Sequence, residues 1–143
     1  MRHLLTVLIF IVSATNPVSA QQSGMPDKEQ LAIALDYFSG GKYREALNIL
    51  SRLDKKYKLN PRFKAYIGLC YYYEWNYSMA CTYIDPYIED LEVYAPHERS
   101  IYYFTAAESH FFLGEYDKAV PLYEKTVSYT HIRAHETTLH LVC

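Results

Sequence analysis

The residues whose types are best suited to metal binding or catalysis lie at the C-terminal end, in VSYTHIRAHETTLHLVC, residues 127–143. This stretch holds three of the six histidines and one of the three cysteines. A metallohydrolase with a His-Glu-x-x-His pattern needs imidazoles four residues apart, because that spacing places both on one helix face, where they bind one zinc ion. In HETTLH the histidines His135 and His140 are five residues apart, which rotates the second by about 140° around a helix.

A second pair, His131 and His135, has the four-residue spacing and could share a metal ion if the segment were helical. The origin of the segment argues against a functional metal site. Its first eleven residues, VSYTHIRAHET, resemble VSYTHLRAHET, the translation of a transposase adapter used in sequencing libraries, with Ile132 in place of Leu. We therefore expect residues 127–143 to be a non-native tail, and the natural protein to continue past residue 126 with further helices.

The other reactive side chains are few. Cys70 and Cys81 could form a disulfide in an oxidising compartment, but two buried free thiols are the favoured interpretation. His110 lies on an apolar helical stripe, so we expect it to fill the core rather than to bind a ligand. No nucleophile motif, Ser/His/Asp set or glycine-rich phosphate loop is present in the sequence. The sequence thus predicts no enzyme activity, no cofactor and no metal.

Composition limits the class of protein further. Hydrophobic residues make up 50% of the 143, so the chain is not disordered by composition. The net charge of −2 offers no basic surplus for nucleic acid. The chain has 16 tyrosines but only 5 glycines and 6 prolines, which favours an all-α fold over a turn-rich β fold.

The N-terminus has the features of a signal peptide. Arg2 provides a positive start, LLTVLIFIVSA an apolar run, and Val18-Ser19-Ala20 the small residues that a signal peptidase reads. An uncleaved membrane anchor is the alternative, but the run falls short of the ~20 residues that span a bilayer. We expect a signal peptide over 1–20, a short linker over 21–26, a periplasmic or secreted protein, and no stable membrane insertion after cleavage.

The rest of the chain repeats one pattern three times, in 31–50, 65–84 and 104–123. Each copy has an apolar stripe, a polar break and a Tyr-x-x-Ala that opens a second stripe. Ala46 and Ala80 are 34 residues apart, and Ala80 and Ala119 are 39 apart. The pattern predicts helices over 27–39, 42–57, 61–73, 77–93, 98–113 and from 116 onward, with Pro86 kinking the fourth.

This periodicity resembles the tetratricopeptide repeat (TPR), in which pairs of antiparallel helices stack into a solenoid. The resemblance implies an all-α solenoid of about three units, near 27–60, 61–95 and 97–126, truncated at the C-terminus. An ordinary helical bundle is the alternative. Helices that cross closely need small residues at the crossing, and the repeat-packing positions are Ala34, Ala46, Gly68, Ala80, Ala107 and Ala119. Gly41 and Gly114 fit the turns between helices, and Asn76 is expected to take the left-handed conformation in the second turn.

In the TPR family the first helices of successive units line a concave groove that binds a partner polypeptide. The resemblance places that partner groove at Leu31, Leu35, Phe38, Leu69, Tyr72, Tyr73, Ile101, Phe104, Glu108, Phe111 and Phe112. The lining is apolar and aromatic and lacks the Lys, Arg and Asn of members that grip a terminal carboxylate. The expected function is a non-enzymatic protein-interaction scaffold of the cell envelope. The alternative is an N-terminal accessory region of a longer exported protein with enzymatic, sensor or wall-binding activity.

Overall fold

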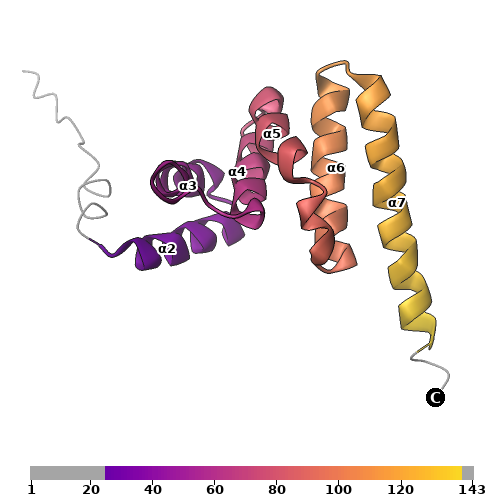
Figure 1. Cartoon of the computed structure of the whole chain (residues 1–143), viewed down its shortest axis with the longest axis horizontal. Coiled ribbons are helices and arrows are strands. Elements are labelled where there is room, and N and C mark those ends of the chain that lie inside the picture. The colour runs from indigo at the N-terminus through magenta and orange to yellow at the C-terminus, as the bar shows by residue number, and fades with distance from the viewer. Residues whose placement is uncertain (1–24, 140–143) are drawn as a thin grey trace, which may run out of the picture.

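A computed structural model describes residues 25–139, with side chains from 25 to 129, and this part is all-helical (Figure 1). The predicted signal peptide, most of the linker and residues 140–143 lie outside this range. The elements are α2 (Asp27–Ser39), α3 (Tyr43–Tyr57), α4 (Pro61–Tyr73), α5 (Tyr77–Ile84), the 3-10 turns η2 (Asp85–Tyr87) and η3 (Asp90–Val93), α6 (Pro96–Phe112) and α7 (Tyr116–Leu139). They form three helix-turn-helix pairs in sequence order, as the repeat pattern predicts.

The turn inside each pair is built by the same hydrogen bonds. The N–H groups of Lys42, Asn76 and Glu115 each donate to the carbonyl five residues earlier, at 2.8 to 2.9 Å. The residue before each donor has a positive φ, as this type of helix ending requires: 73° at Gly41, 63° at Trp75 and 78° at Gly114. The left-handed residue of the second turn is therefore Trp75. The expectation for Asn76 is wrong, because Asn76 instead caps α5 by accepting from the N–H of Met79 at 3.2 Å.

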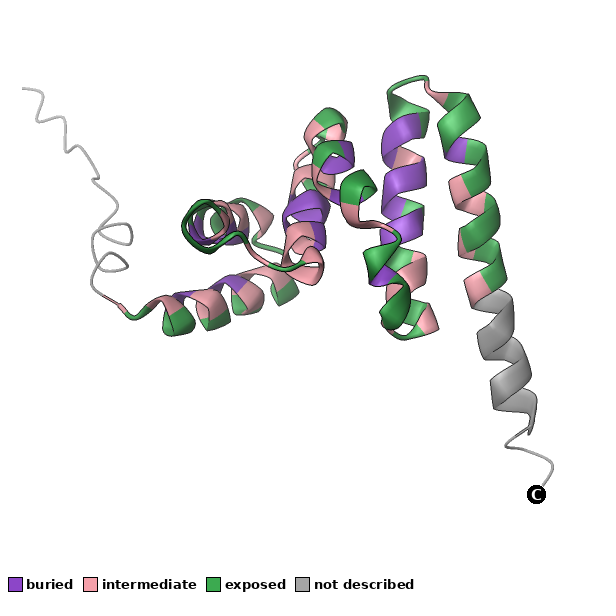
Figure 2. Ribbon diagram, in the orientation of Figure 1, coloured by how far each residue is buried: buried purple, intermediate pink, exposed green. Residues whose placement is uncertain are grey.

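The small residues of the repeat lie where the helices of each pair cross, and all six are buried. The closest approach is at Gly68, where an added Cβ would lie 2.4 Å from Cγ1 of Ile84 and 3.2 Å from the carbonyl oxygen of Ala80. A side chain at Gly68 would therefore push α4 and α5 apart. Figure 2 shows buried residues concentrated on α6 in the interior, whereas the described part of α7 is largely exposed.

The fourth helix is shorter than predicted. The sequence suggests one kinked helix over 77–93, but α5 ends at Ile84 and the chain continues through η2 and η3. Pro86 lacks an N–H, and its ring clashes with the carbonyl four residues earlier, so the α-helical hydrogen bonds stop there. Asp85 and Glu92 therefore lie in separate 3-10 turns, η2 and η3, and not on one helix.

The last helix passes the predicted boundary at Val127 and runs to Leu139. Tyr129 still packs on the rest of the molecule: its ring lies 5.4 Å from that of Tyr103, and the Arg99 guanidinium lies 4.4 Å above it. The side chains of the tail histidines lie outside the described residues. Within the described part of the chain, no helix combines the length and apolar character needed to cross a membrane.

Candidate functional site

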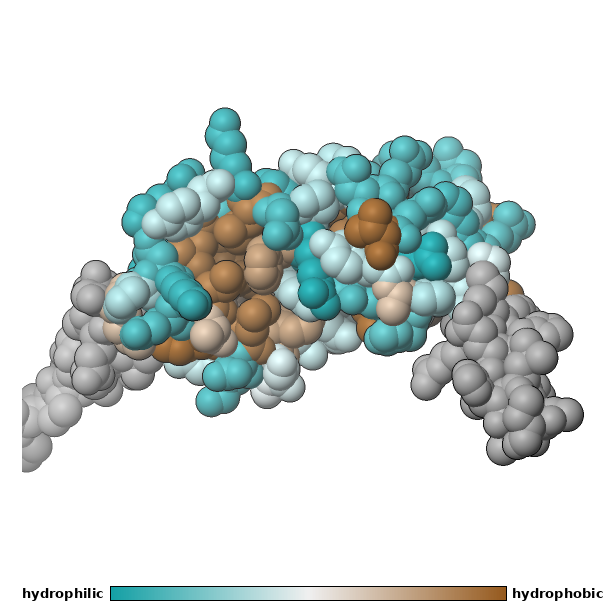
Figure 3. Space-filling model, turned by 60° about the horizontal axis from the view of Figure 1, so that its bottom comes forward, coloured by the Kyte–Doolittle hydropathy of each residue, from teal (hydrophilic) through white to brown (hydrophobic). Residues whose placement is uncertain are grey.

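The first helix of each pair contributes to one hollow of about 350 Å³. Its floor belongs to a buried cluster that includes Leu69 and Tyr102, with Phe38 and Tyr66 packed against it. Figure 3 shows hydrophobic residues gathered around a hollow in the N-terminal half of the molecule, with hydrophilic residues at its rim. The lining residues are Phe38, Tyr43, Arg62, Tyr66, Leu69, Tyr73, His97, Glu98, Ile101 and Tyr102.

A second hollow of about 330 Å³ adjoins the first. It is lined by Tyr72, Tyr73, Ser100, Ile101, Phe104, Thr105 and Thr126. Tyr73 and Ile101 line both hollows, so they form a ridge between them. These two side chains are 44% and 48% exposed, which leaves much apolar surface open to a ligand. We call the two hollows together with this ridge the concave groove.

Aromatic contacts between helix pairs fix the shape of the concave groove. The rings of Tyr43 and Tyr73 stack at 4.1 Å between centroids, and Phe38 lies 5.0 Å from Tyr66. Stacked and tilted rings at such distances add stability beyond their buried area. They also hold the groove wall in place, so the hollow exists before any ligand enters.

One charged pair crosses the first hollow. The guanidinium of Arg62 donates to both carboxylate oxygens of Glu98, at 2.7 and 3.1 Å, and the Tyr102 hydroxyl donates to the same carboxylate. This bidentate bond raises the pKa of Arg62 above its usual value, so the guanidinium stays charged. Burial, followed by the bond to Glu98, raises the pKa of Tyr102, so its hydroxyl stays neutral. The one arginine of the first hollow is therefore already neutralised within the molecule.

The predicted groove residues divide into two groups. Six of them line the concave groove: Phe38, Leu69, Tyr72, Tyr73, Ile101 and Phe104. The other five line neither hollow. Leu31 packs partly buried against the first core cluster, Glu108 accepts from the Tyr123 hydroxyl, and the rings of Phe111 and Phe112 pack near the last turn and on Tyr77. Leu35 is also partly buried.

The polar part of the groove lies outside the predicted groove residues. Arg62, Tyr66, His97 and Glu98 lie in the first two turns of α4 and α6, before the apolar stripes that were used to predict the groove. Arg62 and Glu98 stand 36 residues apart, close to the repeat period, and that spacing of opposite charges is the signal that could have revealed them. His97 lies in the first turn of α6.

The two cysteines of the second pair are free thiols and are buried. Burial raises the pKa of each to about 12, so in the absence of a bound metal ion both thiols are protonated near neutral pH. No disulfide joins the described residues, in agreement with the favoured interpretation of Cys70 and Cys81.

Comparison with solved structures identifies the fold. The second TPR domain of Spaghetti (RPAP3), bound to the HSP90 peptide SRMEEVD, matches with a TM-score of 0.58 and 20% identity, covering 78% of this chain and 98% of that one. PcrH, in complex with the chaperone binding region of PopB, matches with a TM-score of 0.59 and 21% identity over 80% of this chain and 91% of that one. No protein-family profile and no curated protein matches. The predicted all-α TPR solenoid is confirmed.

Proposed function

We propose that the concave groove binds a segment of a partner protein and that the chain acts as a non-enzymatic interaction scaffold. The observation that carries this proposal is the pair of adjoining hollows across α4 and α6, with Tyr73 and Ile101 exposed between them. The two structural neighbours are each in complex with a peptide or a binding region of another protein. A solenoid with an open apolar groove is suited to the same task.

The chemistry of the groove favours an apolar segment over an acidic one. The peptide held by the Spaghetti domain, SRMEEVD, carries three acidic residues, and unpaired cations are the groups that bind carboxylates most strongly. In the first hollow here Arg62 is paired with Glu98, so an acidic ligand would have to break an existing bidentate bond. Aliphatic and aromatic side chains, by contrast, would meet the exposed Tyr73, Ile101 and Phe104 directly.

The proposal also includes a cellular location. The charged start, apolar run and small residues of 1–20 support export, and therefore a partner in the periplasm or outside the cell. Mass spectrometry of the protein from a secreting host would test this. A mature N-terminus at Gln21 would support export, whereas a retained Met1 would contradict it.

Selection from a random peptide library displayed on phage tests the binding proposal. We expect enriched peptides to be rich in Leu, Ile and Phe and poor in Asp and Glu. Ile101→Asp should weaken their binding at least tenfold, because it places a charge on the ridge between the two hollows. Val93→Asp is the matched control, since Val93 is 82% exposed on η3 and lines neither hollow. Equal binding by the two variants would exclude the groove.

A further inference from the structure

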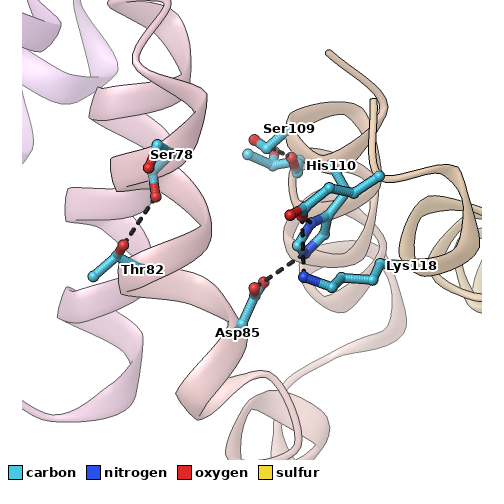
Figure 4. A network of polar contacts seen from close by, with 8 residues as sticks. Ser78, Thr82, Asp85, Ser109, His110 and Lys118 are labelled. Carbon is cyan, nitrogen blue, oxygen red and sulfur yellow. Dashed lines mark hydrogen bonds and ion pairs between the residues drawn. The ribbon is translucent and has the colours of Figure 1, made fainter. Parts of the chain in front are cut away.

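Three metal-binding side chains converge where the second helix pair meets the third. Cys81 lies on α5, Asp85 on η2 and His110 on α6, and their potential ligand atoms all lie within 4.8 Å of one another. Nε2 of His110 is 3.0 Å from Oδ2 of Asp85 (Figure 4). Cys81 and His110 are buried, whereas the Asp85 side chain is 41% exposed and opens the cluster to solvent.

The histidine has a carboxylate on each side. Nδ1 of His110 is 2.6 Å from Oε2 of Glu115, opposite the contact between Nε2 and Asp85. A neutral imidazole has one N–H, so it can donate to only one of these two carboxylates. If Nδ1–H donates to Glu115, the lone pair of Nε2 points toward Asp85 and needs a positive group there. A carboxylate that orients a ligating histidine in this way is the usual outer partner of a metal-bound imidazole.

The local charges also fit a divalent ion. Lys118 lies 3.2 Å from Glu115 and is the one cation in contact with the cluster among the described residues. With Cys81 as a thiolate, the cluster would hold three negative charges, from Cys81, Asp85 and Glu115. Lys118 and a divalent metal ion together balance these three charges, and the metal ion offsets the cost of a buried thiolate at Cys81.

The repeat itself does not require these residue types. One period earlier, the equivalent positions at the junction between the first and second pairs hold Leu47, Ser51 and Tyr71. Those residues provide no thiol, carboxylate or imidazole, and the Ser51 hydroxyl is buried without a hydrogen-bond partner in the described region. The donor set is therefore a specific feature of the second junction and not a consequence of the helical packing.

We propose that Cys81, Asp85 and His110 bind a zinc ion that links the second helix pair to the third. Thiolate, imidazole and carboxylate together form a typical zinc ligand set, whereas calcium and magnesium prefer oxygen ligands alone. Three protein ligands leave a fourth position for water on the side of Asp85 that faces solvent. Glu115 acts through His110 and is a positioning residue.

Titration of the full chain with Co²⁺, after removal of bound metals with a chelator and with the thiols kept reduced, tests this proposal. Cobalt bound to a thiolate has a charge-transfer band in the near ultraviolet, which reports the sulfur ligand directly. We expect the band to saturate at one equivalent and to disappear when Zn²⁺ is added. Absence of the band would overturn the proposal.

Variants separate this site from other donors in the chain. Cys81→Ser should abolish the band, whereas Cys70→Ser should leave it unchanged, because Cys70 is also a buried thiol but lies outside the cluster. A variant in which His131, His135, His140 and Cys143 are all replaced by Ser should also keep the band. Loss of the band in this tail variant, or its survival in Cys81→Ser, would show adventitious binding elsewhere and overturn the proposal.

Two further variants make the test independent of any folding defect in Cys81→Ser. Asp85→Asn changes a partly exposed side chain, so helix content by circular dichroism should be retained while Co²⁺ affinity falls at least tenfold. Glu115→Gln should weaken binding about ten- to a hundredfold, the usual effect of losing a carboxylate that orients a ligating histidine. Unchanged affinity in Asp85→Asn would remove the carboxylate from the site and contradict the assignment.

Discussion

The two junctions between helix pairs differ in chemistry. At the first, where α3 meets α4, the contact is mainly apolar, with Leu50 and Leu53 in one cluster with Ile67. A partly buried ion pair, Asp54–Lys64 at 2.9 Å, accompanies it. At the second, where α5 meets α6, Cys81, Asp85 and His110 stand where the first junction has Leu47, Ser51 and Tyr71. A solenoid can therefore keep its helix crossings and still acquire a polar site between units.

The reason for the difference lies in the length of the second helix. The 15 residues of α3 continue across the first junction, whereas α5 stops after 8 because of Pro86. The end of α5 turns Asp85 toward α6, where it contacts His110. A helix break that looks like a defect in the repeat thus provides the third donor of the cluster.

The largest effect should come from the apolar junction. Leu50→Ala should lower the free energy of unfolding by about 3 kcal/mol, because Leu50 is fully buried and its truncation leaves a cavity. Urea unfolding followed by circular dichroism measures this, with exposed Val93→Ala as a control that should change little. A loss below about 1 kcal/mol would mean that the first junction does not depend on apolar packing.

Zinc should have the next largest effect, and only through the second junction. At a free concentration of about 100 times the Kd, zinc should raise the free energy of unfolding by about 2.7 kcal/mol. A variant that carries the first junction's residues, Cys81→Leu with Asp85→Ser and His110→Tyr, should fold but gain nothing from zinc. Equal stabilisation of the two proteins would show that the junctions do not differ in metal binding.

Substitutions in the turns inside the helix pairs test whether these turns are equivalent, although the junctions between the pairs differ. Gly114→Ala should cost about 1 kcal/mol, because an added Cβ meets no atom within 4 Å and only the left-handed backbone is strained. Trp75→Gly should gain about 0.5 kcal/mol, since Trp75 bears the same strain and is 79% exposed. Thermal unfolding measures both. Changes of the same sign would mean that the second turn is not equivalent to the third.

Much of the fold could be predicted from the sequence, since helix pairs follow from apolar periodicity and small residues recur in phase. Local signals predicted the start of the third helix at residue 61 correctly, and in the structure Asn60 caps α4 there. They failed at Pro86, where a kink and a helix end are equally consistent with the same residue.

The candidate sites were harder to predict, because they depend on contacts between units. Whether an aromatic residue faces the groove or a neighbouring ring depends on its side-chain rotamer, so Phe112 stacks on Tyr77 although Phe104 lines a hollow. Asp85 and His110 are 25 residues apart, and their meeting depends on where α5 ends. A periodic pattern in the sequence specifies neither the side-chain rotamers nor the residue at which α5 ends.

The smallest effect concerns the segment that follows α5 and leads into the second junction. Glu92 on η3 accepts from the Tyr103 hydroxyl at 3.2 Å and lies 3.5 Å from Lys125, and these contacts, the first above all, lower its pKa below the usual 4.5. A carboxyl group whose pKa is lowered in the folded state stabilises the protein at pH values above its unfolded-state pKa. It loses that contribution as the pH falls through its folded-state pKa.

Glu92→Gln should therefore reduce stability slightly near pH 7 and leave it unchanged near pH 3. Urea unfolding at both values measures this, with exposed Glu89→Gln as control. A Glu92→Gln effect that persists in acid would assign the stabilisation to packing of η3 and not to its charge.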